Sequence, residues 1–319
     1  MGIRAKSDEC IPQKIQKIIT TEEAVKQFKI IGAAVGQSAS VTGCETAPEL
    51  IRAQLPYLAP LWTKTIYYPQ APLGGANLSR DDQLQDLAVF SWRLAGLTRE
   101  VLASGAQFIT FGGDHSAAIG TWSGVAQKHE QFGLLWIDAH MDAHTPESSP
   151  SGNPHGMPVA CLLGHGDSRL ISIGSNRPKL RPENLIMIGI RSFEREEAAL
   201  LRRMGVTIYL MDEVKRLGFA ACLLRAERSL LSRGLSYGIS LDFDALEPED
   251  FPGLGTPEAN GIRLNELTRA LDQLDFSRLL GMEFAEYNPR LEADHRFGIA
   301  AIDRILHHIP GLVRQRAAG

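Results

Sequence analysis

The chain has 319 residues and no run of about 18 uncharged apolar residues, which predicts one large or two modest soluble domains rather than a membrane protein. Its 33 lysines and arginines stand against 37 aspartates and glutamates, for a formal charge of −4 without a long basic block, so nucleic acids and anionic membranes are not expected partners. The four cysteines are scattered without a C-x-x-C pair, which argues against a disulfide framework and a zinc–thiolate site.

Residues 1–25 are expected to form a polar lead-in to a single domain over residues 26–319. They lack the apolar core of a signal peptide, which predicts a cytoplasmic protein. Pro48 then marks the first turn of a helix, and residues 81–103 carry apolar side chains at helical spacing. Strands are predicted at 28–35, 64–68, 106–111, 134–138, 185–190, 206–210, 237–241 and 279–284. Apolar strands that alternate with helical segments predict an α/β fold with a mostly parallel sheet covered on both faces.

The stretch from residue 133 to residue 155 is the first candidate for chemistry. Its apolar run ends at Ile137, and the next residues include Asp138, His140 and Asp142. Residues two apart in an extended chain point to the same face, so these carboxylates and the imidazole can converge on one point. Such a group suggests a metal ion. The alternative is an aspartate that caps the following loop, beside a surface histidine.

Other strands of the predicted sheet also end in polar residues. His115 follows one strand, and Asp242 and Asp244 follow another. Each could be structural, for example as a cap, but ligands of an open parallel sheet bind beyond the carboxyl ends of its strands. Together with the first group, they supply two imidazoles and four carboxylates, whose negative charges match two divalent cations. This set without a thiolate favours Mn²⁺, with Co²⁺, Ni²⁺ or Fe²⁺ as alternatives. Two ions roughly 3.5–4 Å apart would lower the pKa of a bridging water, which indicates a hydrolase.

Four motifs together resemble the arginase/agmatinase (ureohydrolase) family: GGDHS at 112–116, DAHMD at 138–142, SGNPHG at 151–156 and SLDFD at 240–244. They occur in family order, and the resemblance extends from about residue 32 to the C-terminus. It implies a three-layer α/β/α fold, a binuclear Mn²⁺ centre, and hydrolysis of a guanidinium group to urea and an amine, commonly in a homo-oligomeric trimer or hexamer. By position, it implies the metal ligands His115, Asp138, His140, Asp142, Asp242 and Asp244, with His155 as a proton shuttle and Glu286 as the residue that holds the guanidinium.

The chemistry of a guanidinium is consistent with those roles. A carboxylate such as Glu286 can pair with two N–H groups of this planar cation and aim its carbon at the nucleophile. Asp142 could pass a proton to the leaving nitrogen, while His155 exchanges protons with solvent. The alternatives are purely structural roles. Glu286 could form a surface salt bridge, and His155 could form a hydrogen bond with Ser151 or Asn153.

The far end of the pocket decides which guanidine is cleaved. The loop with Ser151 and Asn153 resembles the arginase loop that binds the substrate carboxylate. The segment 191–197, with Glu194 and Glu197, is similar to the arginase segment that meets the α-amino group, and Thr256 fits a pocket residue of the family. The expected reaction is therefore the cleavage of L-arginine to urea and L-ornithine.

Three residues depart from that pattern. His144 stands where arginases usually carry Asn, Glu194 stands where they usually carry Asp, and Glu258 is more typical of agmatinases. A protonated His144 would add a cation near the substrate carboxylate. An agmatinase, or another guanidino-acid ureohydrolase, is therefore the alternative.

Two further classes are weaker candidates. A metallophosphoesterase uses similar motifs, but its D-x-H motif comes first in the chain. Here the G-D motif with Asp114 precedes the D-x-H motif at 138–140. An inactive metal-binding regulatory subunit would have lost a catalytic group, and Asp142, His155 and Glu286 are all present.

Overall fold

The structure is a computed structural model and describes residues 27–69 and 79–312. Within these residues, eight strands form one sheet. The predicted lead-in of residues 1–25 lies outside these ranges. The strand order is β2-β1-β3-β8-β7-β4-β5-β6, and every neighbouring pair is parallel. All of the predicted strands are confirmed to within two residues at each end: β1 (Phe28–Ala34), β2 (Trp62–Tyr67), β3 (Gln107–Gly112), β4 (Gly133–Ile137), β5 (Leu185–Ile190), β6 (Thr207–Leu210), β7 (Tyr237–Asp242) and β8 (Leu279–Ala285).

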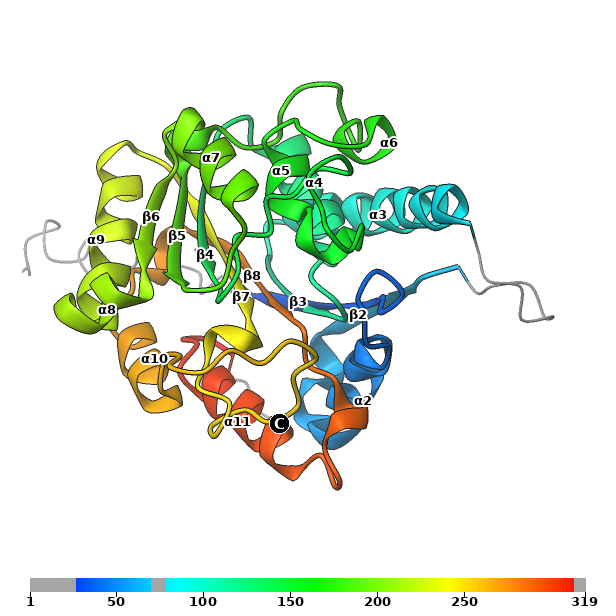
Figure 1. Ribbon diagram of the computed structural model, residues 1–319. Helices are drawn as coiled ribbons and strands as arrows, with labels where there is room; N and C mark the ends of the chain where they lie inside the picture. Colours follow the sequence, from blue (N-terminus) through cyan, green and yellow to red (C-terminus); the bar gives the residue numbers. More distant parts are fainter. Residues whose placement is uncertain (1–26, 70–78, 313–319) are drawn as a thin grey trace, which may run out of the picture.

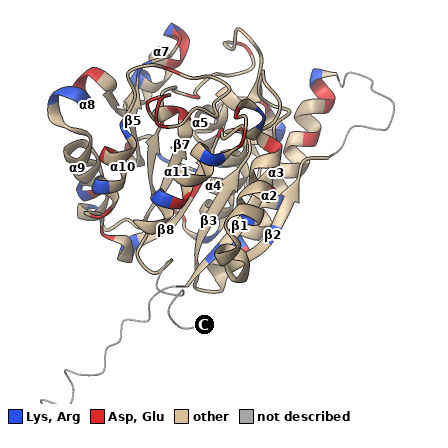
Figure 2. Cartoon of the chain, turned by 90° about the horizontal axis from the view of Figure 1, so that it is seen from below, with Lys and Arg blue, Asp and Glu red and all other residues tan. Residues whose placement is uncertain are grey.

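Helices cover both faces of this sheet, which confirms the predicted three-layer α/β/α fold (Figures 1 and 2). One face packs against α3 (Arg80–Ala103), α4 (Ala117–Lys128), α5 (Pro158–Leu162), α6 (Ser168–Ile171) and α7 (Arg195–Met204). The other packs against α2 (Ala47–Gln54), α8 (Met211–Leu217), α9 (Phe219–Ser232), α10 (Leu264–Leu271) and α11 (Arg296–His307).

Burial explains why the strands were recognisable as continuous apolar runs. Strands β3, β4, β5, β7 and β8 are buried along their whole length, as expected for a parallel sheet between two helical layers. The edge strand β2 is exposed at Thr63 and Lys64. Both residues are polar, so the apolar pattern of this edge strand is weaker than that of the central strands.

The strand order places the ends of β3, β8, β7 and β4 side by side at the centre of the sheet. The residue after β3 must be a glycine: a Cβ at Gly113 would lie 1.6 Å from the carbonyl oxygen of Val35. The chain therefore passes close to β1, and the Asp114 N–H donates to the same oxygen at 2.8 Å. This contact fixes the direction in which the segment after β3 leaves the sheet.

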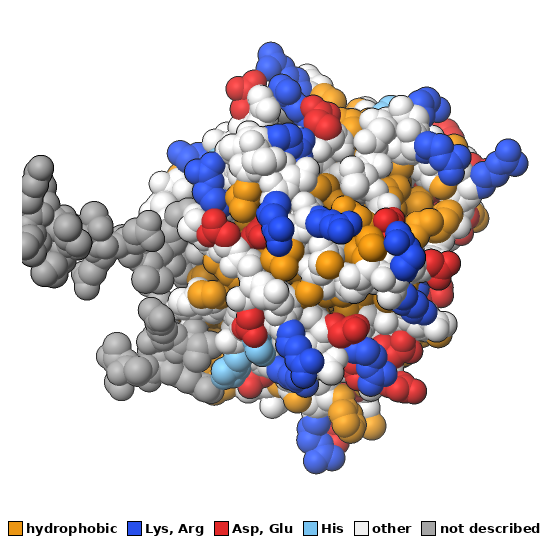
Figure 3. Space-filling view, turned by 90° about the vertical axis from the view of Figure 1, so that its left-hand side faces the viewer, with side chains coloured by type: hydrophobic (Ala, Val, Ile, Leu, Met, Phe, Trp, Pro, Cys, Tyr) orange, Lys and Arg blue, Asp and Glu red, His pale blue; other side chains and the backbone are white. Residues whose placement is uncertain are grey.

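The surface carries both signs of charge. On the face seen in Figure 3, basic side chains lie among acidic ones. None of the helices in residues 27–69 and 79–312 is both long and apolar enough to cross a membrane. Cys44, Cys161 and Cys222, the cysteines among the described residues, are buried and free.

Candidate active site

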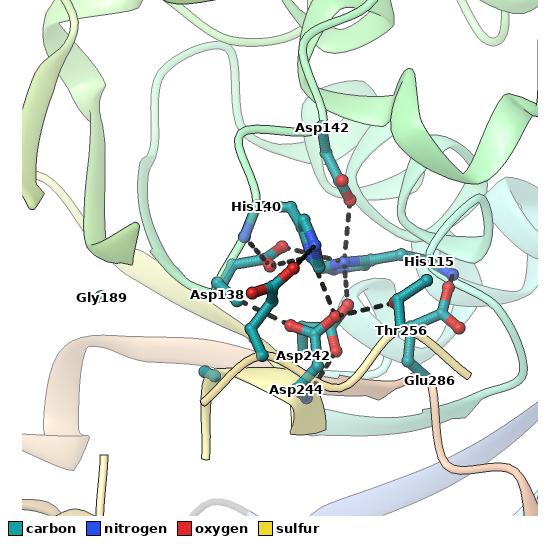
Figure 4. A network of polar contacts seen from close by, with 12 residues as sticks. His115, Asp138, His140, Asp142, Gly189, Asp242, Asp244, Thr256 and Glu286 are labelled. Carbon is teal, nitrogen blue, oxygen red and sulfur yellow. Dashed lines mark hydrogen bonds and ion pairs between the residues drawn. The ribbon is translucent and has the colours of Figure 1, made fainter. Parts of the chain in front are cut away.

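The predicted metal ligands come together at the carboxyl ends of three strands (Figure 4). His115 follows β3, the DAHMD motif follows β4, and Asp242 is the last residue of β7. Their ligand atoms form two groups, each with all atoms within 4.8 Å of one another. The groups share one carboxylate: the first is His115, Asp138, Asp142 and Asp242, and the second is Asp138, His140 and Asp244.

In the first group, His115 Nδ1 lies 2.9 Å from Asp242 Oδ2, 3.1 Å from Asp142 Oδ2 and 3.3 Å from Asp138 Oδ2. This nitrogen is buried, yet it forms no hydrogen bond of normal geometry. Three carboxylate oxygens and an imidazole nitrogen thus face one point without satisfying one another. In the second group, His140 Nδ1 lies 2.9 Å from Asp244 Oδ2 and 3.7 Å from Asp138 Oδ1.

The electrostatics of the two groups also fit a pair of cations. Burial, together with the charges of Asp142 and Asp244, raises the pKa of Asp138 to about 7. Burial also raises the pKa of Asp242 well above its ordinary value. No lysine or arginine within residues 27–69 and 79–312 lines the adjoining pocket. Bound divalent cations would therefore stabilise the ionised carboxylates, and this donor set of carboxylates and imidazoles suits two of them.

Glu286 follows the end of β8 in a left-handed conformation, with φ of 66°, and the residue is 3% exposed. Its Oε1 accepts the backbone N–H of His115 at 2.8 Å and lies 3.1 Å from His155 Nδ1. Glu286 is therefore no surface salt bridge, and His155 pairs with it rather than with Ser151 or Asn153. Because positive φ is costly for a residue with a side chain, the surrounding contacts must hold Glu286 in this conformation.

The His155–Glu286 pair is charged in both partners. Burial opposes the imidazolium, but the hydrogen bond with Glu286 and the charge of that carboxylate raise the pKa of His155 to about 9. Burial likewise opposes the carboxylate, but His155 lowers the pKa of Glu286 below its ordinary value. A protonated imidazole thus lies beside the pocket at neutral pH.

The pocket has a volume of about 230 Å³, and the predicted substrate residues all line it. They share its wall with the predicted catalytic residues and with most of the metal ligands. The lining residues named from the sequence are His140, Asp142, His144, Ser151, Asn153, His155, Glu194, Glu197, Asp242, Asp244, Thr256 and Glu286.

His144 differs from the arrangement expected from the sequence. Its Nε2 lies 2.9 Å from Glu194 Oε2 and 3.3 Å from Glu197 Oε2, and its Nδ1 lies 3.1 Å from Ser148 Oγ. The ring therefore already contacts the acidic pair that was assigned to the α-amino group. Glu197 is also fixed by the backbone N–H of Ala143, at 2.9 Å.

Several neighbours were not singled out from the sequence. Trp136 donates from Nε1 to Asp138 Oδ2 at 2.8 Å and stacks on His115 with ring centroids 4.2 Å apart. Its position two residues before Asp138 on the same strand was a usable signal. Ser40, whose Oγ accepts from Asn153 Nδ2 at 2.6 Å, comes from a distant loop and gave no such signal.

A parallel α/β sheet whose strand ends carry two adjoining histidine–carboxylate groups defines the chain as a protein of the two-metal hydrolase class. A family model described as the arginase family matches residues 26–309. The chain is 32% identical to the arginase of Bacillus subtilis over 286 residues, or 88% of this chain and 96% of the relative. The chain therefore belongs to the arginase family.

Solved structures agree with that assignment. The arginase of Bacillus caldovelox superposes with a TM-score of 0.81 at 35% identity, over 89% of this chain and 97% of that one. The arginase of Entamoeba histolytica, solved in complex with L-ornithine, has a TM-score of 0.81 at 26% identity, over 90% of this chain and 99% of that one.

Proposed function

We propose that this protein hydrolyses L-arginine to urea and L-ornithine. One observation carries the proposal: four of the six metal ligands, the buried carboxylate of Glu286 and the acidic pair Glu194 and Glu197 line one pocket, which no lysine or arginine of the described residues lines. Such a pocket suits a substrate with a cation at each end. Arginine carries a guanidinium at one end and an α-ammonium at the other. The solved arginase of Entamoeba histolytica holds L-ornithine, which has the same head group.

His115, Asp138, His140, Asp142, Asp242 and Asp244 would hold two divalent cations, for which we propose Mn²⁺. When bound, the cations would lower the pKa of a water molecule and stabilise negative charge that develops on oxygen. We propose that the whole described chain acts as one domain, in a cytoplasmic homo-oligomer such as a trimer or hexamer.

Glu286 would bind the guanidinium. Its side chain lies at the end of β8 beside the metal ligands, so a bidentate pair with two guanidinium N–H groups would place the central carbon next to them. Water adds to that carbon, the bond between the carbon and the substituted nitrogen breaks, and this nitrogen must gain a proton. Asp142 would carry a proton from the water to the leaving nitrogen. His155, protonated and partly exposed, would then exchange protons with solvent.

The head group would be recognised at the opposite end of the pocket. Glu194 and Glu197 would accept the α-ammonium, while Ser151 and Asn153 would donate to the α-carboxylate. Thr256 lines the same pocket, and its hydroxyl donates to Asp244 Oδ2 at 3.2 Å. It would therefore border the aliphatic part of the substrate, next to the metal ligands. His144 would exchange part of its contact with Glu194 for the substrate carboxylate, so that one polar contact replaces another.

The test is urea release from L-arginine, agmatine and 4-guanidinobutyrate by the protein reconstituted with Mn²⁺. We expect the kcat/KM of arginine to exceed that of both analogues by several powers of ten, because each analogue lacks one charged group of arginine and leaves the polar residues that would meet it without their partner. His144→Asn should lower this preference. A higher kcat/KM for agmatine or 4-guanidinobutyrate would assign the site to another ureohydrolase reaction.

A further inference from the structure

A second buried carboxylate, Glu283, lies on β8 beneath the metal ligands and is fully buried. Three donors surround it. Thr121 Oγ1 donates to Oε1 at 2.8 Å, and both Trp122 Nε1 and Ser240 Oγ donate to Oε2, at 2.8 and 3.0 Å. The donors come from α4 and β7, so this carboxylate joins one helix to two strands. Nothing in the proposed reaction uses it.

Ser240 connects this carboxylate to the first metal group. Its Oγ lies 3.0 Å from Nε2 of His115, the histidine whose Nδ1 faces Asp138, Asp142 and Asp242. The hydroxyl therefore stands between an acceptor and an imidazole nitrogen. Because a hydroxyl has one proton, it can donate to only one of the two.

The donors around Glu283 decide the direction of that proton. An indole N–H can only donate, so Trp122 requires an acceptor at Oε2. Ser240 shares this oxygen, which already accepts from the indole and so also serves as the acceptor for the hydroxyl, and the Ser240 proton points to Glu283. The lone pairs of the hydroxyl are then left for His115, whose Nε2 must carry a proton. Nδ1 is consequently the nitrogen with a free lone pair.

We propose that Glu283 and Ser240 are positioning residues that fix the tautomer of His115 and thereby prepare Nδ1 as a metal ligand. They also hold the ring in place from the side opposite the carboxylates, in addition to its stacking on Trp136. Outer-shell partners of this kind raise the basicity of a histidine ligand and remove the cost of selecting a tautomer when the cation binds. The inference rests on the proposed metal centre but not on the identity of the substrate.

The experiment measures the affinity of the full-length protein for Mn²⁺ by calorimetry and metal analysis, in four variants. Ser240→Ala removes the acceptor for the Nε2 proton and should weaken the tighter Mn²⁺ site roughly 10-fold to 100-fold. Glu283→Leu should weaken it similarly, because the hydroxyl is then free to rotate. Glu283→Gln can keep its carbonyl oxygen at the Oε2 position and turn its amide to Thr121, so its affinity should stay within about threefold of wild type. Ser91→Ala is the control, since this buried serine on α3 has no hydrogen-bond partner among the described residues.

The outcomes separate this inference from a structural role and from the proposed function. The metal-free variants should melt within a few degrees of wild type, and kcat at saturating Mn²⁺ should be largely restored in Ser240→Ala. Wild-type affinity in Ser240→Ala would overturn the inference, as would a loss in Glu283→Gln equal to that in Ser240→Ala. Should Glu283→Leu not fold, the other two variants still decide. A wild-type protein that binds fewer than two ions would instead refute the proposed metal centre.

Discussion

Replacing Glu286 with glutamine tests the assignment of the guanidinium site. The substitution keeps the shape of a buried side chain but removes its negative charge. A hydrogen bond to a charged group contributes about 1.5–3 kcal/mol, and a guanidinium can form two with this carboxylate. The loss is then roughly 3–6 kcal/mol, which corresponds to about a 10²-fold to 10⁴-fold decrease in kcat/KM. Both kcat and KM should change, because Glu286 binds the cation and also orients it.

The assay is urea release from L-arginine at equal metal content, with wild type and variant measured side by side. Glu292→Gln is the matched control. This acid is also buried, and it accepts from Tyr287 Oη at 2.7 Å and from the Gly298 N–H at 2.9 Å, but it does not line the pocket. The control should lose stability and keep its kcat/KM. A Glu286→Gln enzyme within threefold of wild type would refute the guanidinium assignment.

Three further predictions concern the metals, the proton shuttle and the turn after β3. Removing the metals should abolish urea release while circular dichroism shows an intact fold, and Mn²⁺ should restore activity; metal analysis that finds fewer than two ions per active chain would contradict the two-ion centre. His155→Asn should lower kcat about 10²-fold to 10⁴-fold and leave metal content and KM nearly unchanged, because a proton shuttle acts during turnover, and an unchanged kcat would exclude this role. Gly113→Ala should destabilise the fold by about 3 kcal/mol or more in denaturant titrations, since its Cβ would lie 1.6 Å from the Val35 carbonyl oxygen. Gly96→Ala, with no atom within 4 Å of the new Cβ, should be neutral or stabilising, and equal effects at the two positions would show that the close contact is not what matters.

The local pattern of the sequence was sufficient to predict the strands and to group the candidate metal ligands. Apolar runs of β-prone residues mark segments that are buried on both faces, and these segments are the central strands of the sheet. The alternation in Asp138, His140 and Asp142 follows from the period of an extended chain, which depends only on neighbouring residues. Their convergence with His115 could be predicted because strand ends of a parallel sheet meet at one edge. The roles that we propose for the individual site residues came from the family motifs.

Partners that are distant in the sequence were decided by the tertiary structure. Strand β8, last along the chain, lies between β3 and β7, so Glu286 meets the backbone of His115 across 171 positions. Backbone hydrogen bonds between strands are nearly the same for any pair of sequences, so strand order depends on how all the helices and loops pack together. The same reason applies to His144, which contacts Glu194 across 50 positions, and to Glu283, which meets Ser240 across 43. The sequence singled out His144 and Glu194 but not Glu283, and the partners of all three depended on packing that no local pattern encodes.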